Sequence, residues 1–258
     1  MNRDDMLLNT IADLRERVAQ LERRESDANW GAVIGRHLAL PNLRALWPMN
    51  NPGNAGEMLD MSGHSRQLTW GAGASAGLYN NRILYANFNG TTAHLLCASE
   101  AAFNTTTIPI SWGGWFWFNS VASQQVVLSK WDTAAQRSWG MDMLNGSPNT
   151  FRAYISSTGA DSQVVTSSVA PSTNAWYHIV ARFTPSTELA IFVNGVKSTL
   201  TSSVFASIFS STAQVRVSSY ASGAGFLNGR AALCFFCANA LPDSLIAGLY
   251  RSARFFFQ

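Results

Sequence analysis

Residues 115–118 read Trp115-Phe116-Trp117-Phe118, and they close a strand-like segment that begins at Ile110. Successive side chains of a β-strand point to opposite faces, so this stretch presents aromatic rings on both of its faces. Such a strand has to be covered on both sides to keep these rings out of water. We therefore expect a central strand, covered either by a two-sheet stack or by a neighbouring subunit.

Around this stretch, glycine, serine, asparagine and proline separate short segments rich in β-branched and aromatic residues. Residues 190–193 alternate into Asn194-Gly195, a strong signal for a tight antiparallel hairpin. Strand candidates at this spacing predict a sandwich or barrel. They are Leu43–Pro48, Ile83–Phe88, Ile110–Phe118, Gln125–Lys130, Ser138–Leu144, Thr150–Ile155, Trp176–Phe183, Glu188–Val193, Ala213–Val217 and Arg230–Ala238.

Short motifs follow one another in a particular order along these segments. They are Ala45-Leu46-Trp47-Pro48-Met49, Leu59-Asp60-Met61-Ser62-Gly63, Ala86-Asn87-Phe88-Asn89-Gly90, Ser111-Trp112-Gly113-Gly114-Trp115-Phe116, Val127-Leu128-Ser129-Lys130, Asn174-Ala175-Trp176-Tyr177-His178-Ile179-Val180, Leu189-Ala190-Ile191-Phe192-Val193-Asn194-Gly195, and Phe226-Leu227-Asn228-Gly229 through Ala240-Leu241. Over roughly residues 43–250 this order resembles concanavalin A-like lectin/glucanase domains of the laminin-G type. The resemblance implies a mainly β fold: a two-sheet antiparallel sandwich (jelly roll) over residues 43–258 that ends in a short helix, Asp243–Tyr250.

The N-terminal residues follow a different period. Apolar side chains alternate in steps of four and three, with Leu7, Leu14 and Leu21 at d positions and Ile11 and Val18 at a positions. This pattern predicts a coiled-coil helix over residues 1–28, followed by a linker over residues 29–42. Residues 17–22 resemble the trimer-specifying pattern of short coiled coils, in which Arg17 pairs with Glu22 of a neighbouring helix. We expect a homotrimer; a two-stranded coil and a solvated helix on its own domain are the alternatives.

Composition narrows the classes further. The chain has 258 residues and net charge +3, and 47% of its residues are hydrophobic, which excludes a disordered chain. No apolar run approaches ~20 residues, and the first residues lack the apolar core of a signal peptide, so we expect neither membrane insertion nor secretion. Basic residues form no cluster, which argues against nucleic-acid binding. Three cysteines make no disulfide framework, so we expect reduced thiols and assembly in a cytoplasm.

No constellation for catalysis emerges. Glycoside hydrolysis needs two carboxylates facing one cleft, but the closest acidic pair after residue 28, Glu57 and Asp60, has an odd spacing that separates the two on a strand. Residues 73–77 match the nucleophile-elbow string, yet the setting predicts a flexible loop. Cys234 and Cys237 should point to opposite faces, as buried structural thiols. We therefore expect no enzyme and no cofactor.

The resemblance raises two kinds of binding. Calcium occurs in laminin-G-type domains, and Asp60 and the Asn89 region match positions that supply oxygen ligands in some members. Ala231-Ala232 stands where the family has an acidic pair, so calcium is only an open alternative here. Glycan binding is what the resemblance implies for the fold, through aromatic rings at loops. The candidates are Trp70, Tyr79, Trp131 and Trp139, although a tryptophan more often belongs to a core or an interface than to a sugar-binding surface.

The predicted coiled coil over residues 1–28, the few lysines and the lack of a catalytic constellation favour a structural protein of a virus particle. We expect a tailed-bacteriophage capsid decoration protein, head fibre or tail-associated fibre, located in the virion and in contact with capsid or tail proteins. The alternative is a soluble or surface lectin or adhesin. At the C-terminus, residues 255–257 are three consecutive phenylalanines, which predict either a lid on the chain's own domain or an anchor on a partner.

Overall fold

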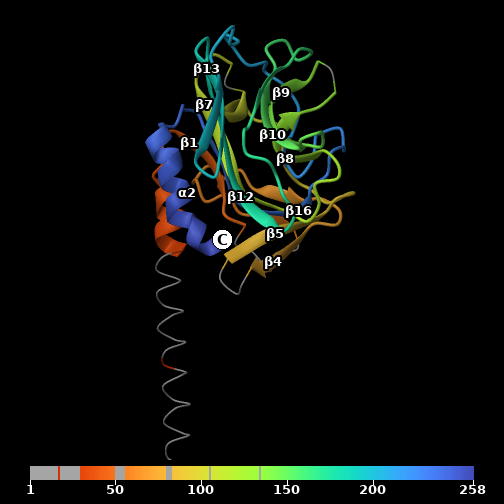
Figure 1. The fold of residues 1–258 in the computed structure, drawn as a ribbon, viewed down its shortest axis with the longest axis vertical. Helices are drawn as coiled ribbons and strands as arrows, with labels where there is room; N and C mark the ends of the chain where they lie inside the picture. Colours follow the sequence, from red (N-terminus) through yellow and green to blue (C-terminus); the bar gives the residue numbers. More distant parts are fainter. Residues whose placement is uncertain (1–16, 18–29, 50–55, 80–82, 105, 134) are drawn as a thin grey trace, which may run out of the picture.

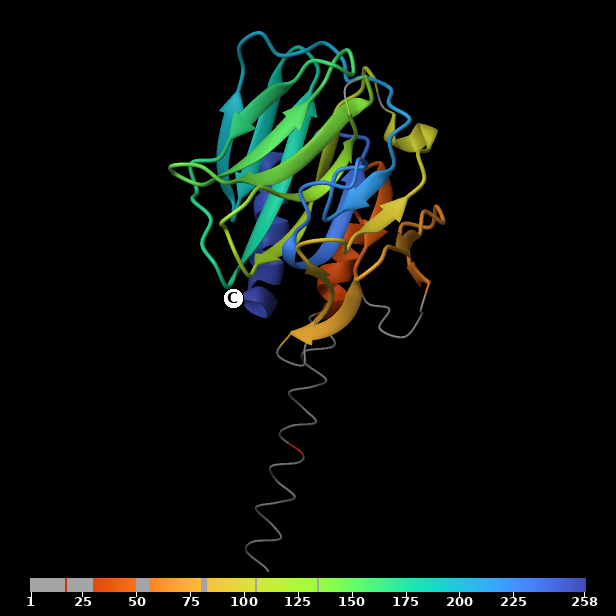
Figure 2. The same cartoon turned by 90° about the vertical axis from the view of Figure 1, so that its right-hand side faces the viewer.

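The computed structural model describes residues 17, 30–49, 56–79, 83–104, 106–133 and 135–258. These residues form two antiparallel sheets of eight strands each. Figures 1 and 2 show that the two sheets stack face to face. In sheet A the order is β14 (Val196–Leu200), β13 (Glu188–Val193), β12 (Ala175–Thr184), β7 (Ile110–Phe118), β16 (Asn228–Cys237), β5 (Ile83–Asn89) and β4 (Ser75–Tyr79), and β1 (Leu43–Trp47) also pairs with β16. In sheet B it is β11 (Gln163–Thr166), β10 (Thr150–Ile155), β9 (Arg137–Leu144), β8 (Gln125–Trp131), β15 (Val215–Val217), β6 (Leu95–Cys97), β3 (Leu68–Trp70) and β2 (Glu57–Met58).

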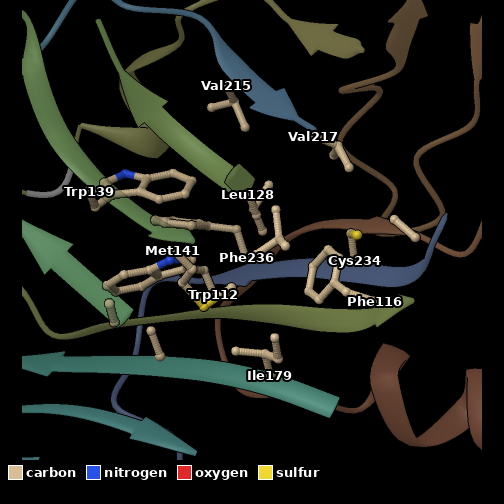
Figure 3. Packing of buried hydrophobic residues seen from close by; sticks show 14 of the residues in the cluster. Trp112, Phe116, Leu128, Trp139, Met141, Ile179, Val215, Val217, Cys234 and Phe236 are labelled. Atoms are coloured by element: carbon tan, nitrogen blue, oxygen red, sulfur yellow. The ribbon is translucent and has the colours of Figure 1, made fainter. Parts of the chain in front are cut away.

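The main core lies between the two sheets (Figure 3). From the middle of sheet A, β7 points Trp112, Phe116 and Phe118 into this core, and all three are fully buried. Sheet B contributes Trp139 to the same core, and its ring centroid lies 5.4 Å from that of Trp112 and 5.0 Å from that of Phe236. The predicted two-sheet sandwich is thus confirmed, and so is the central position of the strand at Ile110–Phe118.

A layer of two helical segments covers the other face of sheet A (Figure 1). We call it the helix layer; it consists of helical residues 30–38 and helix α2 (Asp243–Phe257). Trp115 precedes the inward-facing Phe116 in β7 and therefore points to the opposite face of sheet A. Its ring stacks on that of Phe257 with a centroid distance of 4.2 Å and an interplanar angle of 11°. The second cover that the aromatic strand requires therefore comes from the chain itself.

Two expectations about this layer need correction. The segment predicted as a linker over residues 29–42 is helical from residue 30 to residue 38. It buries Val33, Ile34 and His37, because residues three and four apart lie on one face of a helix. The terminal helix does not end at Tyr250 but runs to Phe257, so the three phenylalanines are helical. Phe256 and Phe257 are buried against their own domain, which is the lid arrangement.

The sequence also missed strands that are short or lie at edges. These are β2, β3, β4, β6, β11 and β14. β4 includes Ser75 and Gly77 of the segment expected to be a flexible loop, and it pairs with β5 as an antiparallel edge strand. That setting is not the strand-to-helix turn that a nucleophile elbow requires.

The coiled-coil prediction lies outside the described residues, apart from Arg17, which is helical and exposed. The same holds for the remaining predicted trimerisation residues Leu7, Ile11, Leu14, Val18, Leu21 and Glu22. In the described ranges, no helix has the length and apolar character needed to cross a membrane.

The helix layer yields a stability prediction. Replacing Phe257 by alanine removes a ring stacked on Trp115 and should lower the free energy of unfolding by about 3–5 kcal/mol. The matched control is Phe255→Ala, two residues away in the same helix, where the side chain is 68% exposed and the expected loss is below about 0.5 kcal/mol. Urea unfolding of both variants measures the difference. Equal losses would show that the layer does not depend on this stack.

Candidate functional site

The outer face of sheet B carries a groove that we call the sheet B groove. It is lined by Trp131, Arg152, Tyr154, Ser162, Val164 and Tyr220. Strand alternation places these side chains: Ala153 of β10 enters the core, so its neighbours Arg152 and Tyr154 face outward. Tyr154 pairs across the sheet with Val164 of β11, which therefore shares the outward face. The groove thus lies over adjoining strands of one sheet.

Its aromatic part is built around Tyr154. The Trp131 ring meets the Tyr154 ring edge-on, with centroids 4.7 Å apart, and Tyr220 lies 6.3 Å from Tyr154 on another side. Gly140 pairs with Tyr154 across β9 and β10, and a Cβ atom at Gly140 would lie 2.6 Å from the Tyr154 ring. Only glycine therefore lets the Tyr154 ring lie across β9 in this position.

An ion pair between Asp142 and Arg152 lies beside these rings. The Asp142 carboxylate accepts two hydrogen bonds from the Arg152 guanidinium, at 2.9 and 2.5 Å, and one from Gln124 Nε2 at 2.6 Å. The Asp142 side chain is fully buried, whereas that of Arg152 remains 21% exposed. Burial alone would lower the pKa of Arg152, but the hydrogen bonds and charge of Asp142 raise it above its ordinary value. Arg152 is therefore held as a cation in a fixed orientation at the edge of the groove.

The Tyr154 hydroxyl is a buried polar group of the groove that lacks a well-formed hydrogen bond. Tyr154 is only 4% exposed, and its hydroxyl lies beside that of Tyr220 without a hydrogen bond of normal geometry to any described residue. Burial raises the pKa of Tyr154 well above its ordinary value, so the hydroxyl keeps its proton. A buried donor without a well-formed hydrogen bond costs up to about 1–3 kcal/mol.

The glycan candidates from the sequence do not gather in one place. Trp131 lies in the groove, where the Arg137 guanidinium is 5.6 Å from its ring centroid. Trp139 is fully buried between the sheets, so its assignment to a glycan surface is wrong: β9 alternates, and Trp139 shares the inward face with Met141. Trp70 is in β3 and packs its partly buried ring against the core. Tyr79 is in β4 of the other sheet, and its side chain is outside the described part of the chain.

The sequence reasoning missed Asp142, Arg152, Tyr154 and Tyr220. Arg152 and Tyr154 could have been paired, because they alternate with inward-facing Phe151 and Ala153. Their contact with Asp142 depends on the register between β9 and β10, and their contact with Tyr220 depends on the path of the loop after β15. Neither the register nor the path of the loop can be predicted from the neighbouring residues in the sequence.

The arrangement around Asp60 does not fit a calcium ion. Oδ1 accepts hydrogen bonds from the backbone N–H groups of Leu46 and Ser62, both at 2.9 Å. Oδ2 accepts from Ser62 Oγ at 2.8 Å and from the backbone N–H of Arg66 at 3.0 Å. Calcium needs six to eight oxygen ligands, whereas here hydrogen-bond donors surround both carboxylate oxygens. Asp60 therefore holds residues 60–66 against β1 through hydrogen bonds. This structural role replaces the predicted one of Asp60 as a calcium ligand.

Asn89 has the same character, since its side-chain oxygen accepts hydrogen bonds from three successive backbone N–H groups, those of Thr91, Thr92 and Ala93. Across the residues that the structure describes, no group of three or more histidine, cysteine, aspartate or glutamate side chains could hold a metal ion. Cys234 lies in the main core and Cys237 in the cluster under the helix layer, which confirms their opposite faces. Burial raises the pKa of both thiols.

Lys130 is buried in a structural role. Its ammonium group donates to Ser99 Oγ and to the carbonyl oxygens of Ser211 and Ala213, at 2.6–2.8 Å. Burial lowers the pKa of Lys130 to about 8. With all three donor protons used, this cation ties the segment before β15 to β8 and is not presented to a ligand.

Comparisons with known proteins place this geometry in a family. Residues 89–232, more than half of the chain, match the family described as the concanavalin A-like lectin/glucanases superfamily. The chain belongs to this superfamily. As a concanavalin A-like domain, it buries one face of each sheet in the sandwich and leaves the groove on the outer face of sheet B.

Three solved structures similar to this concanavalin A-like domain come from toxins. They are the binding domains of botulinum neurotoxin DC (TM-score 0.63, 10% identity), Paraclostridial Mosquitocidal Protein 1 (0.65, 14%) and botulinum neurotoxin serotype C1 (0.65, 9%). Each alignment covers 82% of this chain and 51–52% of the toxin domain, so the chain spans about half their length. At these identities the likeness concerns the fold alone. No curated protein shows a significant sequence match.

The Asp60 geometry predicts a calcium-independent structural role. Asp60→Ala leaves several donors without an acceptor and should lower the free energy of unfolding by at least about 1–3 kcal/mol. Asp132→Ala is the control, because the Asp132 carboxylate accepts one local hydrogen bond, from Thr133, and should change little. Thermal unfolding of the parent protein with calcium and with EDTA completes the test. A melting temperature that rises with calcium would overturn this interpretation of Asp60.

Proposed function

We propose that this chain is a non-enzymatic glycan-binding domain whose ligand occupies the sheet B groove. One observation carries the proposal: the groove combines a partly exposed indole, Trp131, with a buried hydroxyl, that of Tyr154, which lies beside the Tyr220 hydroxyl and makes no hydrogen bond of normal geometry to a described residue. Sugar rings offer an apolar C–H face and hydroxyl groups at once. They therefore complement an aromatic ring that is flanked by fixed polar groups.

The fold comparisons support this proposal over a purely structural role. The superfamily description names lectins. The similar binding domain of botulinum neurotoxin DC was solved in complex with SialylT, and for botulinum neurotoxin type C cell entry depends on interaction with two ganglioside molecules. Another similar structure holds rat synaptotagmin II. Because this chain spans only half of those domains, its own partner has to be argued from its own groove.

The charges of the groove also favour binding over catalysis. Hydrolysis of a glycosidic bond uses two carboxyl groups on either side of the bond. The described lining of the groove includes no carboxylate; Asp142 lies beside it, and Arg152 holds both of its oxygens. A carboxylate fixed in this way orients a binding residue and is poorly placed to transfer a proton to a substrate.

The homotrimer prediction concerns residues 1–28, which lie almost wholly outside the described part of the chain, and it remains a prediction, as does the virion prediction. A trimer would present three grooves together. Linking several weak sites strengthens binding to a surface of repeated ligands, so trimerisation would support glycan binding and equally a fibre on a particle.

A glycan array followed by calorimetric titration of the best ligand tests the proposal. Trp131→Ala should weaken binding by roughly 10-fold or more, since removal of a stacking ring costs ~1.4 kcal/mol or more. Tyr154→Phe removes one hydroxyl and should weaken binding by about 2- to 10-fold.

The matched control for these variants is Phe255→Ala, because Phe255 is an exposed ring on the helix layer, away from sheet B. It should bind with parental affinity. A chain that binds no glycan, or one whose binding survives both groove substitutions, would contradict the proposal.

A further inference from the structure

Two of the four histidines are buried in the same layer. His37 lies on helical residues 30–38, and His178 lies on β12, where it pairs with Trp115 of β7 and so shares its outward face. Both histidines are 0% exposed. They therefore occupy the contact between the helix layer and the outer face of sheet A, one from each side.

The surroundings of both rings are aromatic. The His178 ring centroid lies 5.2 Å from that of Trp115 and 6.1 Å from that of Tyr250 on α2, and His37 lies 5.8 Å from Phe235. His37 Nδ1 donates to the carbonyl oxygen of Val33 at 2.8 Å. His37 Nε2 and both ring nitrogens of His178 have no hydrogen-bond partner within the described ranges. Such a layer accommodates neutral imidazole and strongly disfavours imidazolium.

No described residue places an opposite charge beside either ring; the Asp243 carboxylate of α2 and the Glu188 carboxylate of β13 pair with Arg182 and Lys197. From the helical residues 30–38 the titratable group facing His178 is His37, and from α2 it is Tyr250. On the side of sheet A, where described, the rings meet aromatic side chains and no carboxylate. The cations of the two helices, Arg36, Arg251 and Arg254, are exposed. A proton gained by either histidine would therefore stay unpaired in the layer.

We propose that the helix layer is an acid-sensitive clasp: protonation of His37 and His178 releases helical residues 30–38 and α2 from sheet A while the two-sheet sandwich stays folded. The sandwich itself is insulated from this change. The buried histidines of the described chain, His37 and His178, both lie outside the core cluster between the sheets. The two layers therefore differ in their response to acid.

The direction of the effect follows from the pKa values. Burial lowers the pKa of His37 to about 4, and burial together with the charge of His37 lowers the pKa of His178 to about 3. The released state has ordinary histidine pKa values near 6.5 and binds more protons between these limits. The clasp is therefore fully stable above pH 6.5 and weakens as the pH falls towards 3–4. At pH 5 each histidine favours the released form by roughly 30-fold.

Amide hydrogen exchange at pH 7 and pH 5, corrected for the intrinsic exchange rate, tests the clasp on the full chain. At pH 5 we expect protection of residues 30–38 and α2 to fall by at least ~10-fold, with β7, β12 and β16 still protected. An unchanged helix layer at pH 5 would overturn the proposal. Loss of protection in the sheets together with the helices would also overturn it, because the acid response would then be global unfolding.

The double variant His37→Leu/His178→Leu removes both protonation sites and keeps the layer apolar, so its protection at pH 5 should match that at pH 7. His64→Gln is the matched control, since His64 is exposed, and it should respond to acid like the parent. A double variant that still loses the helices at pH 5 would contradict the role of the two histidines.

If the double variant does not fold, the histidine Cε1–H resonances of the parent decide the question. Two of the four should resist protonation until the helices are released. Titration of all four near pH 6.5 with the layer still protected would overturn the proposal.

Discussion

Trp115 and Phe116 are consecutive residues of β7 and point to opposite faces of sheet A, and both are fully buried. The rest of the structure depends on this two-sided burial. One face of the sheet requires a second sheet, and the other requires a separate cover, which α2 and helical residues 30–38 provide. With sheet A covered on both sides and the inner face of sheet B used by the core, the outer face of sheet B is the open sheet surface that carries the groove.

The groove on sheet B depends on the same alternation of side chains between the two faces of a strand. In β9, Trp139 and Met141 enter the core, which turns Gly140 and Asp142 outward; in β10, Ala153 enters and Tyr154 faces out. The positions that hold the sandwich together thus also set the register of the groove. Gly140 leaves room for the Tyr154 ring across β9, so the position of the ring depends on this register rather than on a well-formed hydrogen bond from its hydroxyl.

Much of the sandwich was predictable because its signals are local. The bounds of β7, β10 and β13 coincide with the predicted strands, and the Asn194-Gly195 hairpin joins β13 to β14 with both residues at positive φ. The same local alternation would have assigned Trp139 to the core, so the error there was one of interpretation. The terminal helix was predicted too short because three consecutive phenylalanines suggest an exposed end. Phe256 and Phe257 are buried through Trp30, Trp115 and Trp176, which lie far away in the sequence.

The candidate site was predictable only through Trp131. Arg152, Tyr154 and Asp142 meet through cross-strand register, and Tyr220 returns to them on a loop after β15, so their proximity is a property of the tertiary structure. The buried histidines were likewise invisible in the sequence, where His37 stood in a segment expected to be a linker and His178 in a strand without ligand spacing. Both histidines are buried because the helix layer packs on the outer face of sheet A, and this packing has no signal in the sequence around either residue.

The central claim is that a glycan lies on the outer face of sheet B. Mapping of chemical-shift changes on isotope-labelled protein, during titration with the glycan that the array selects, tests it most directly. The account predicts saturable changes at the Trp131 indole N–H, the Arg152 side chain and the Gly140 amide, with the Trp115 indole of the helix layer unaffected. Changes confined to the helix layer, or no saturable change on sheet B, would contradict it.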